Sequence, residues 1–480
     1  MAKNLPQKRK LAQDDSDSEG LLNSADENDD VESEEELDEG ANSNESDASA
    51  SESESDEEAS SSPDSDTDQD ESVFTWSKSV KMKTVTFQPK ESVGPRNLGF
   101  DPKSFDNDGL TFVNIFLTDD VWQLLVDMTN LRAHQVMAAK PNDYYARQWS
   151  DITIAEMKAF IGVRLSMEYA VIKRRYEKYF STAAGFLFDT PGYRQVFSRD
   201  RFLAIWKFLH VVDEEDAATD KTDKLYKVRP LLKNLLPKFQ DHYVPQQALS
   251  LDEGMIPSKN RLSIKQYIQS KPIKWGIKSF LLCESATGYI VNAEIYTGKT
   301  DGLFIPKLGA TGSVVTRLTA PYNGCNYTLY MDRFYNSPTL TRYLLRRGIQ
   351  SCGTLMPNRK HTPKQLMKTK GKKSKFVRGD SDYLCTKDMS VVVWCDRNPV
   401  YFISSFHDPR EGANVNRKNR DGSVVPSACP KLIVDYTKNM GGCDLNDQLT
   451  KLYRCRRHYR WPRRLMMKVL MWCLYNAYVI

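Results

Sequence analysis

Residues 249–255 have the sequence LSLDEGM, in which apolar and polar residues alternate up to Asp252. This two-residue period is typical of a β-strand with one buried face. A second strand-like run, YTLYM at 327–331, is followed directly by Asp332. We interpret both aspartates as the ends of their strands. If the two strands are neighbours, the two carboxylates lie close together at one edge of a sheet.

A further pair of aspartates occurs in the stretch GGCDLND, which begins at Gly441. Asp444 and Asp447 are three residues apart near the start of a predicted helix at 444–453, so they share one helix face. The two glycines before them permit a tight turn and a close approach of the backbone to a neighbour.

Carboxylates that converge from distant parts of a chain can bind hard divalent cations. Three or four oxygen ligands suit Mg²⁺ or Mn²⁺ rather than zinc. Two such ions, roughly 3.5–4 Å apart, can activate a water or a 3′-hydroxyl and stabilise the leaving oxygen of a phosphodiester. Asp252, Asp332 and Asp444 are therefore candidate catalytic residues and, with Asp447, candidate metal ligands. The alternative is that these aspartates only cap turns and helices, and that Asp447 only orients its helix.

The net charge of +4 conceals two segments of opposite sign. Residues 1–72 contain 26 acidic and 4 basic residues, about −22 in net charge, which leaves about +26 on residues 73–480. A folded region with that surplus is a candidate polyanion binder. The acidic tail either screens that surface or only keeps the chain soluble. The basic run at 8–10, KRK, is a candidate nuclear import signal, so we expect the protein in the nucleus.

The nine cysteines include no CxxC pair, and no zinc module is visible. Most of them lie in apolar runs, which predicts buried, reduced thiols of an intracellular protein. We expect no membrane contact, because the chain opens with no signal peptide and contains no apolar run of 18 residues.

Periodicity and composition divide the chain into five regions and predict an α/β fold with a mixed sheet. Residues 1–72 have too few apolar residues to fold, and residues 73–104 are expected to form a partly ordered linker. We predict, in order, a disordered acidic tail and linker (1–104), a helical region (105–245), the first part of the α/β core (246–358), an inserted β-rich subdomain with a basic loop (359–430) and the C-terminal helices of the core (431–480).

Individual elements follow from helix caps and from period-two runs. Thr118 and Ser198 are candidate helix N-caps, and Thr153 with Glu156 has the spacing of a capping box. Strands are predicted at 277–283, 289–296, 351–355, 382–384, 390–395 and 400–404, and late helices at 339–347, 444–453 and 461–479.

The motifs around the aspartates resemble the piggyBac transposase family, including its domesticated, transposable-element-derived members. They are, in order, LSLDEGMIPSKNR, QYIQSKPIKWGIK, CESATGYI, YMDRFYNSPTL, GTLMPNRK, YTKNMGGCDLNDQ, RRHYRWPRRL and NAYVI. The resemblance covers roughly residues 105–480. It implies a ribonuclease-H-like (DDE/DDD transposase) core, interrupted by the inserted β-rich subdomain and preceded by a helical dimerisation and DNA-binding region.

The resemblance also implies a chemistry. Asp252, Asp332 and Asp444 would be the metal ligands of a DDD site, with Asp447 as an additional acid and two Mg²⁺ or Mn²⁺ ions as cofactors. The partners would be double-stranded DNA and a second copy of the chain. Element ends would be nicked, the freed 3′-hydroxyl would form a hairpin, and the end would then join to TTAA targets.

Basic residues near these motifs are candidate DNA contacts. Two follow a predicted core strand, and several others crowd among aromatic residues at 453–464, a mixture that suits backbone contact and base stacking. The alternative is a solvated helix face. The candidates are Arg333, Arg359, Lys360, Arg454, Arg456, Arg457, Arg460, Arg463 and Arg464.

Three features depart from the family's pattern. Arg333 follows the second aspartate where the family commonly has Asn, and Met356 stands where active relatives often carry Arg. The chain ends at Ile480 without the cysteine-rich zinc-binding domain of many members, so we expect a fragment or a truncated derivative. These features favour an alternative, a domesticated and catalytically inactive DNA-binding chromatin protein. A third hypothesis is a protein-interaction module that acts through its acidic tail.

Overall fold

The computed structural model describes residues 74–81, 85–169, 179–181, 190–258, 262–269, 271, 273–298, 304–367, 377–418, 422–450 and 460–480. All of them belong to the second of the two units into which contacts divide the chain, residues 72–480. The acidic tail at 1–72, which is predicted to be disordered, therefore lies outside the described residues.

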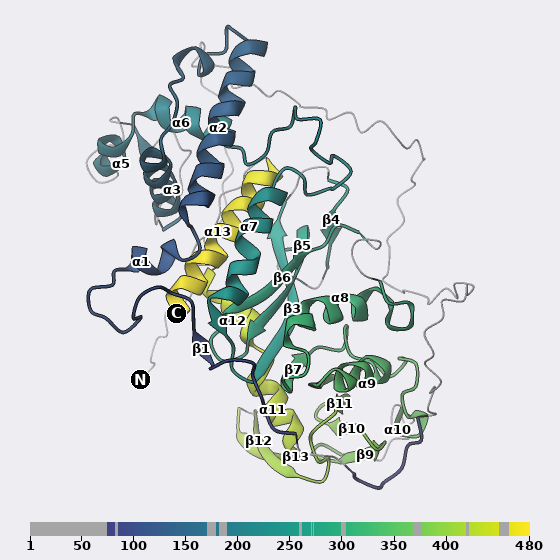
Figure 1. The fold of residues 1–480 in the computed structure, drawn as a ribbon. Helices are drawn as coiled ribbons and strands as arrows, with labels where there is room; N and C mark the ends of the chain where they lie inside the picture. Colours follow the sequence, from purple (N-terminus) through teal and green to yellow (C-terminus); the bar gives the residue numbers. More distant parts are fainter. Residues whose placement is uncertain are drawn as a thin grey trace, which may run out of the picture. The chain divides into compact units, whose positions relative to one another are not determined.

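A nine-stranded mixed sheet forms the centre of this unit (Figure 1). Its strand order is β4-β5-β3-β7-β8-β11-β10-β9, and β6 pairs with β5. The strands are β3 (Ala248–Pro257), β4 (Lys265–Tyr267), β5 (Trp275–Glu284), β6 (Ile290–Ile295), β7 (Tyr327–Met331), β8 (Ile349–Thr354), β9 (Ser381–Cys385), β10 (Ser390–Cys395) and β11 (Pro399–Ser404).

Five of these strands, in the order β6-β5-β3-β7-β8, form a ribonuclease-H-like core. The first three are antiparallel to one another, whereas β7 is parallel to both β3 and β8. Parallel strands need crossover connections, and two helices provide them. They are α8 (Gly309–Thr319), which contacts β5 and β6, and α9 (Pro338–Arg346), which contacts β8.

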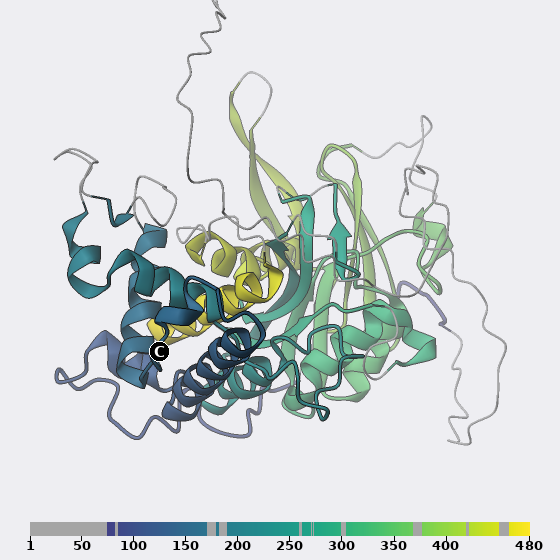
Figure 2. The same cartoon turned by 90° about the horizontal axis from the view of Figure 1, so that it is seen from above.

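The β-rich segment after residue 359 continues the same sheet. Strand β11 pairs with β8, from Phe402 opposite Thr354 to Ser404 opposite Cys352. The next two strands, β12 (Gly412–Lys418) and β13 (Val424–Pro430), instead form a separate hairpin, seen in yellow-green in Figure 2. The predicted strands in this segment are confirmed.

Helices dominate residues 109–241, as the apolar periodicity predicts. Thr118 and Ser198 occupy the predicted N-cap positions, and Ser198 Oγ accepts a hydrogen bond from the Arg201 amide at 3.2 Å. The capping box is only half formed, because the Glu156 carboxylate binds the Arg201 guanidinium instead. The helices are α1 (Gly109–Asn114), α2 (Asp119–Ala139), α3 (Ile154–Tyr169), α5 (Pro191–Val196), α6 (Arg199–Phe208) and α7 (Arg229–Asp241).

Three late helices return to the core. They are α11 (Lys431–Asn439), α12 (Gly442–Thr450) and α13 (Trp461–Val479). Helix α13 packs against α1, α7 and α12, and it is almost wholly buried. Among the described helices, none combines the length and the apolar character that a membrane crossing requires.

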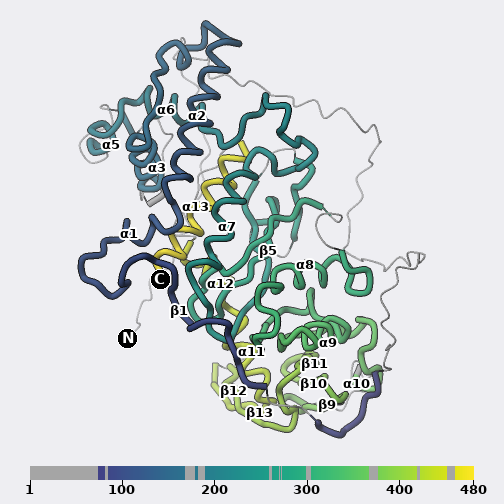
Figure 3. Tube along the Cα trace, viewed as in Figure 1, coloured from purple at the N-terminus to yellow at the C-terminus, as the bar shows by residue number. Residues whose placement is uncertain are grey.

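The linker before the helical region lies along the folded unit, as the purple segment of Figure 3 shows. Its first part pairs with the edge of the sheet, because Ser77 forms an antiparallel bridge with Cys385. Its later part forms β1 (Gly94–Pro95), which pairs with β2 (Tyr243–Val244). All eight cysteines within the described residues are buried and free.

Asn476 of α13 holds the edge strand β6 in place. Its amide group donates to the Ile290 carbonyl and accepts from the Ile290 amide, each at 2.9 Å. We predict that Asn476→Ala lowers the free energy of unfolding by about 2–4 kcal/mol, because both backbone groups become buried and unpaired.

Urea denaturation measures this change. Tyr478→Ala, at an 82% exposed position of the same helix, is the control and should change stability by less than about 0.5 kcal/mol. Equal effects of the two substitutions would contradict the anchoring role.

Candidate active site

Asp252 and Asp332 lie side by side on the central pair of parallel strands. The register places Leu251 opposite Met331, so Asp252, the next residue of β3, is beside Asp332, the residue that directly follows β7. The two strands are neighbours, which is the condition under which the sequence places the two carboxylates close together. The prediction that Asp252 ends its strand is wrong, because β3 continues to Pro257 while paired with β5.

The two carboxylates share a poorly hydrated environment. Burial, with a smaller contribution from the charge of Asp332, raises the pKa of Asp252 to about 6. Burial also raises the pKa of Asp332. Two acidic groups in this state are destabilised as anions, and a nearby cation relieves that destabilisation.

A close contact between β7 and β8 holds the end of β7, where Asp332 follows. A Cβ atom added at Gly353 would lie only 1.8 Å from the Met331 carbonyl oxygen, so this position has no room for a side chain. Asn336 Nδ2 donates to the carbonyls of Met331 and Asp332 at 2.9 and 3.1 Å. It also donates to the Thr354 carbonyl at 3.1 Å, which links the turn after Asp332 to β8.

A lysine that sequence reasoning missed stands beside this pair. Lys271 Nζ is 3.9 Å from Asp252 Oδ2 and donates to the Glu253 carbonyl at 3.2 Å. The pKa values of Asp252 and Asp332 are raised overall, but the positive charge of Lys271 offsets part of the increase that burial causes. The motif QYIQSKPIKWGIK contains this lysine, but nothing in the motif indicates that its side chain turns back to the sheet.

Helix α12 begins directly against β3. A Cβ atom at Gly442 would lie 2.5 Å from Ser250 Oγ and 2.6 Å from the Glu284 carbonyl oxygen. Cys443 Sγ donates to the Ser250 carbonyl at 3.5 Å. Because Ser250 and Asp252 are two residues apart, they share one face of β3. The start of α12 therefore covers the face that carries Asp252.

The other two aspartates lie on this helix. Asp444 is exposed in its first turn, and Asp447 is partly buried, with Oδ1 3.5 Å from Nζ of Lys468 on α13. Within the described ranges, no three His, Cys, Asp or Glu side chains form a group that could hold a metal ion. The structure thus brings Asp252 and Asp332 together and leaves Asp444 outside that pair, on the helix that covers their face.

Three candidate DNA contacts surround the turn after Asp332. Arg333 lies on that turn and is exposed, as is Lys360. Arg359 is partly buried, and its guanidinium donates to the Phe334 carbonyl of the same turn. Arg359 therefore supports the backbone next to Asp332, whereas Arg333 and Lys360 present their charges to solvent.

The arginines near the start of α13 differ in solvent exposure. Arg460 is exposed, whereas Arg463 and Arg464 are only 9% and 7% exposed. The Arg463 guanidinium donates to the Lys207 carbonyl and stacks 5.2 Å from the centre of the Trp206 ring. This burial argues against a DNA contact for Arg463 and Arg464. The candidates Arg454, Arg456 and Arg457 lie outside the described residues.

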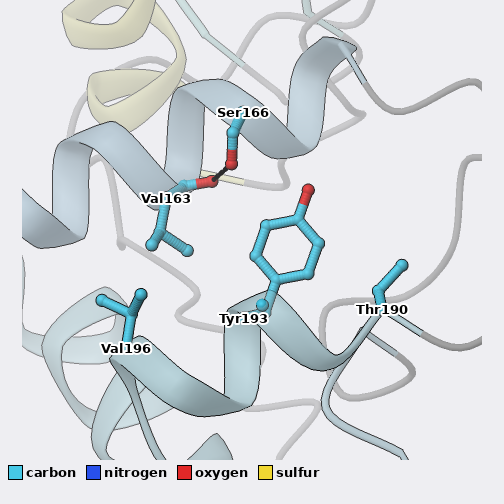
Figure 4. Close-up of a pocket in the computed structure, with 6 residues that line it drawn as sticks. Val163, Ser166, Thr190, Tyr193 and Val196 are labelled. Carbon is cyan, nitrogen blue, oxygen red and sulfur yellow. Dashed lines mark hydrogen bonds between the residues drawn. The ribbon is translucent and has the colours of Figure 1, made fainter.

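A separate hollow of about 240 Å³ lies between α3 and α5 (Figure 4). Tyr193 faces Ser166 across it, and Ser166 Oγ donates to the Val163 carbonyl at 2.8 Å. The described residues that line it include no carboxylate and no basic side chain. It is lined by Val163, Ser166, Thr190, Gly192, Tyr193 and Val196.

The strand order and the two central aspartates define a protein with a ribonuclease-H-like core. Residues 110–478 match the family model described as Transposase IS4, and the chain belongs to this transposase family, in its piggyBac-type branch.

Two human relatives are similar over most of the chain. PiggyBac transposable element-derived protein 3 is 28% identical over 351 residues, which cover 71% of this chain and 56% of that protein. PiggyBac transposable element-derived protein 5 is 25% identical over 381 residues, covering 77% and 70%. The chain therefore spans only about half the length of protein 3.

One solved structure has the same fold. It is the cryo-EM structure of a piggyBac transposase synaptic complex with hairpin DNA, which superposes with a TM-score of 0.67 at 23% identity. The match covers 81% of this chain and 77% of that chain. At this identity the likeness establishes the fold.

The two adjacent glycines before Asp444 provide a matched test of the contact between α12 and β3. We predict that Gly442→Ala lowers the melting temperature by several degrees, because its Cβ would overlap Ser250 and Glu284. Gly441→Ala should leave the melting temperature nearly unchanged, since a Cβ there meets nothing within 4 Å. Thermal unfolding of both variants checks this, and equal melting temperatures would contradict the close approach.

Proposed function

We propose that this protein is a piggyBac-like DNA transposase, which performs metal-dependent phosphodiester cleavage and strand transfer on double-stranded DNA. The observation that carries the proposal is the pair Asp252 and Asp332, two partly desolvated carboxylates on adjacent parallel strands. The family resemblance supports element ends as the substrate and TTAA as the target. The solved relative is a synaptic complex with hairpin DNA, which supports the same substrate class.

The side chains at the pair fit a divalent cation. Asp252 and Asp332 offer hard oxygen ligands, and burial and mutual repulsion disfavour their unpaired anions. Asp444 would complete the ligand set from α12, with Asp447 as an additional acid. Two Mg²⁺ or Mn²⁺ ions, when bound, supply activation of the attacking oxygen and stabilisation of the leaving oxygen.

The basic residues around the pair suit a phosphate backbone. Arg333 and Lys360 are exposed near the turn that follows Asp332, and Lys271 stands beside Asp252. Together they would neutralise phosphates on either side of the scissile bond. We also propose that the protein acts in the nucleus as a homodimer, on the basic run at 8–10 and on the family resemblance.

A nicking assay on a TTAA-flanked hairpin oligonucleotide tests the proposal. Wild-type protein should nick it in Mg²⁺ or Mn²⁺ and lose activity when the metal is chelated. Asp252→Asn should lower the rate by about 10³-fold or more, because it removes a charged ligand from the site.

The control is Asp241→Asn, an exposed position at the end of α7, which should retain activity. Equal nicking by wild type and Asp252→Asn would exclude the proposed catalytic role.

Lys271 is predicted to affect metal binding and cleavage in opposite directions. In Lys271→Gln we expect Mn²⁺ to bind about fivefold more tightly, because the ammonium, 3.9 Å from Asp252 Oδ2, would repel a cation bound there, and two unit charges at such a separation repel by ~1 kcal/mol in water. Cleavage at saturating Mn²⁺ should be slower, since a phosphate partner is lost.

Calorimetric titration and the nicking assay measure the two effects. Lys233→Gln, at an exposed lysine of α7, is the control and should change neither strongly. If Lys271→Gln left both quantities unchanged, the lysine would have no role at the site.

A second candidate function is DNA binding without catalysis. Asp444 is exposed and outside the Asp252–Asp332 pair, and Arg333 follows Asp332 directly. Salt-dependent DNA binding by the wild type without any metal-dependent nicking would favour this candidate. Absence of binding even at low salt would exclude both functions.

A further inference from the structure

Two large aromatic rings are left in solvent at the edge of the central sheet. Tyr267 and Trp275 are directly opposite each other on β4 and β5, with ring centres 4.6 Å apart. They are 46% and 49% exposed. Strand β4 ends the sheet, because among the described strands it pairs only with β5. A cross-strand aromatic pair stabilises a short edge strand, but that role does not require half of each residue to face water.

The aromatic pair lies on the same face of the sheet as Asp252. In an antiparallel ladder, residues opposite each other project to the same face, and Leu281 is opposite Asp252. Trp275 and Leu281 are an even number of residues apart on β5, and the ladder with β3 is regular between them. Six residues of strand span about 20 Å. The rings are therefore about 20 Å from the carboxylate pair along one surface.

The surroundings of the rings are basic. The segment 262–275 contains three lysines and no acidic residue. Lys265 Nζ lies 5.0 Å from the centre of the Trp275 ring, and Lys274 is exposed next to it. Exposed aromatic rings among cations are the combination with which proteins hold unpaired nucleic-acid strands, since every base has a face that can stack.

We propose that Tyr267 and Trp275 form a stacking platform for an unpaired DNA base, with Lys265 and Lys274 on the flanking phosphates. The proposal rests on the proposed function, because it treats the strand on the platform as the strand that reaches Asp252. At 3.4 Å per nucleotide, 20 Å corresponds to about six nucleotides. A base inside an intact duplex has no free face, so the platform selects DNA that is unpaired about six nucleotides from the scissile bond.

Binding measurements in the presence of a metal chelator test the platform without any chemistry. The full chain is titrated with a duplex oligonucleotide and with the same duplex carrying a short single-stranded gap with 2-aminopurine. Trp275→Ala should weaken binding to the gapped DNA by about tenfold and abolish the fluorescence change of stacked 2-aminopurine, with duplex binding within about twofold. Trp275→Phe, which keeps a ring, should retain most of the affinity.

Two controls separate stacking from charge and from misfolding. Tyr478→Ala removes an exposed ring, 82% exposed at the end of α13, and should affect neither DNA. Trp275→Ala should leave the slope of affinity against salt concentration unchanged, whereas Lys265→Gln should lower that slope, because only the latter removes a charge.

Equal losses on gapped and duplex DNA, or no loss in Trp275→Ala, would overturn the platform. Nicking by the wild type together with unaltered binding by Trp275→Ala would refute the platform alone. Selective loss of gapped-DNA binding, in a protein that never nicks, would refute the catalytic proposal and support the platform. Absence of DNA binding by the wild type would refute both.

Discussion

The pairing of β3 with β7 is the interaction on which the rest of the structure depends. It places two carboxylates next to each other where water has limited access, and this arrangement disfavours two anions. Several contacts keep the pair together despite that cost. The lack of a side chain at Gly353 lets β8 approach β7, and Asn336 ties the turn after Asp332 to both strands. Two carboxylates whose pKa values are raised by burial are typical of a functional site.

Much of the core follows from local patterns in the sequence. The β5–β6 hairpin and strands β9 to β11 have a strong period of two or continuous apolar runs, and turn residues bound them. Helices α12 and α13 begin after glycines or at a Trp-Pro pair. Asp252 and Asp332 are neighbours because they occupy corresponding positions on two such strands. Such a local pattern is reliable, because the apolar residues on one face of a strand are the residues that the core buries.

The features that the sequence did not predict correctly share one physical cause. At each of them the structure is determined by tertiary contacts, which a local sequence pattern does not contain. Asp252 lies in the middle of β3 because the partner strand β5 extends the ladder, which period alone does not reveal. Helix α8 was not predicted, since its sequence GATGSVVTRLT is rich in glycine and β-branched residues and becomes helical by packing on β5 and β6. Arg463 has the composition of a DNA contact, but the Trp206 ring and the Lys207 carbonyl hold it inside the protein.

The same contacts limit how Asp444 can approach the pair. Gly442 is pressed against Ser250 and Glu284, so the first residue of α12 cannot move closer to the sheet, and Cys443 is hydrogen-bonded to β3. Asp444 is the next residue, and its exposed side chain is the part of this segment that remains free to reorient. If Asp444 serves as a metal ligand, as proposed, its side-chain rotamer would therefore have to change, because the backbone before it is held against the sheet. Lys271, which already lies beside Asp252, is the group that such a change would have to displace or share the site with.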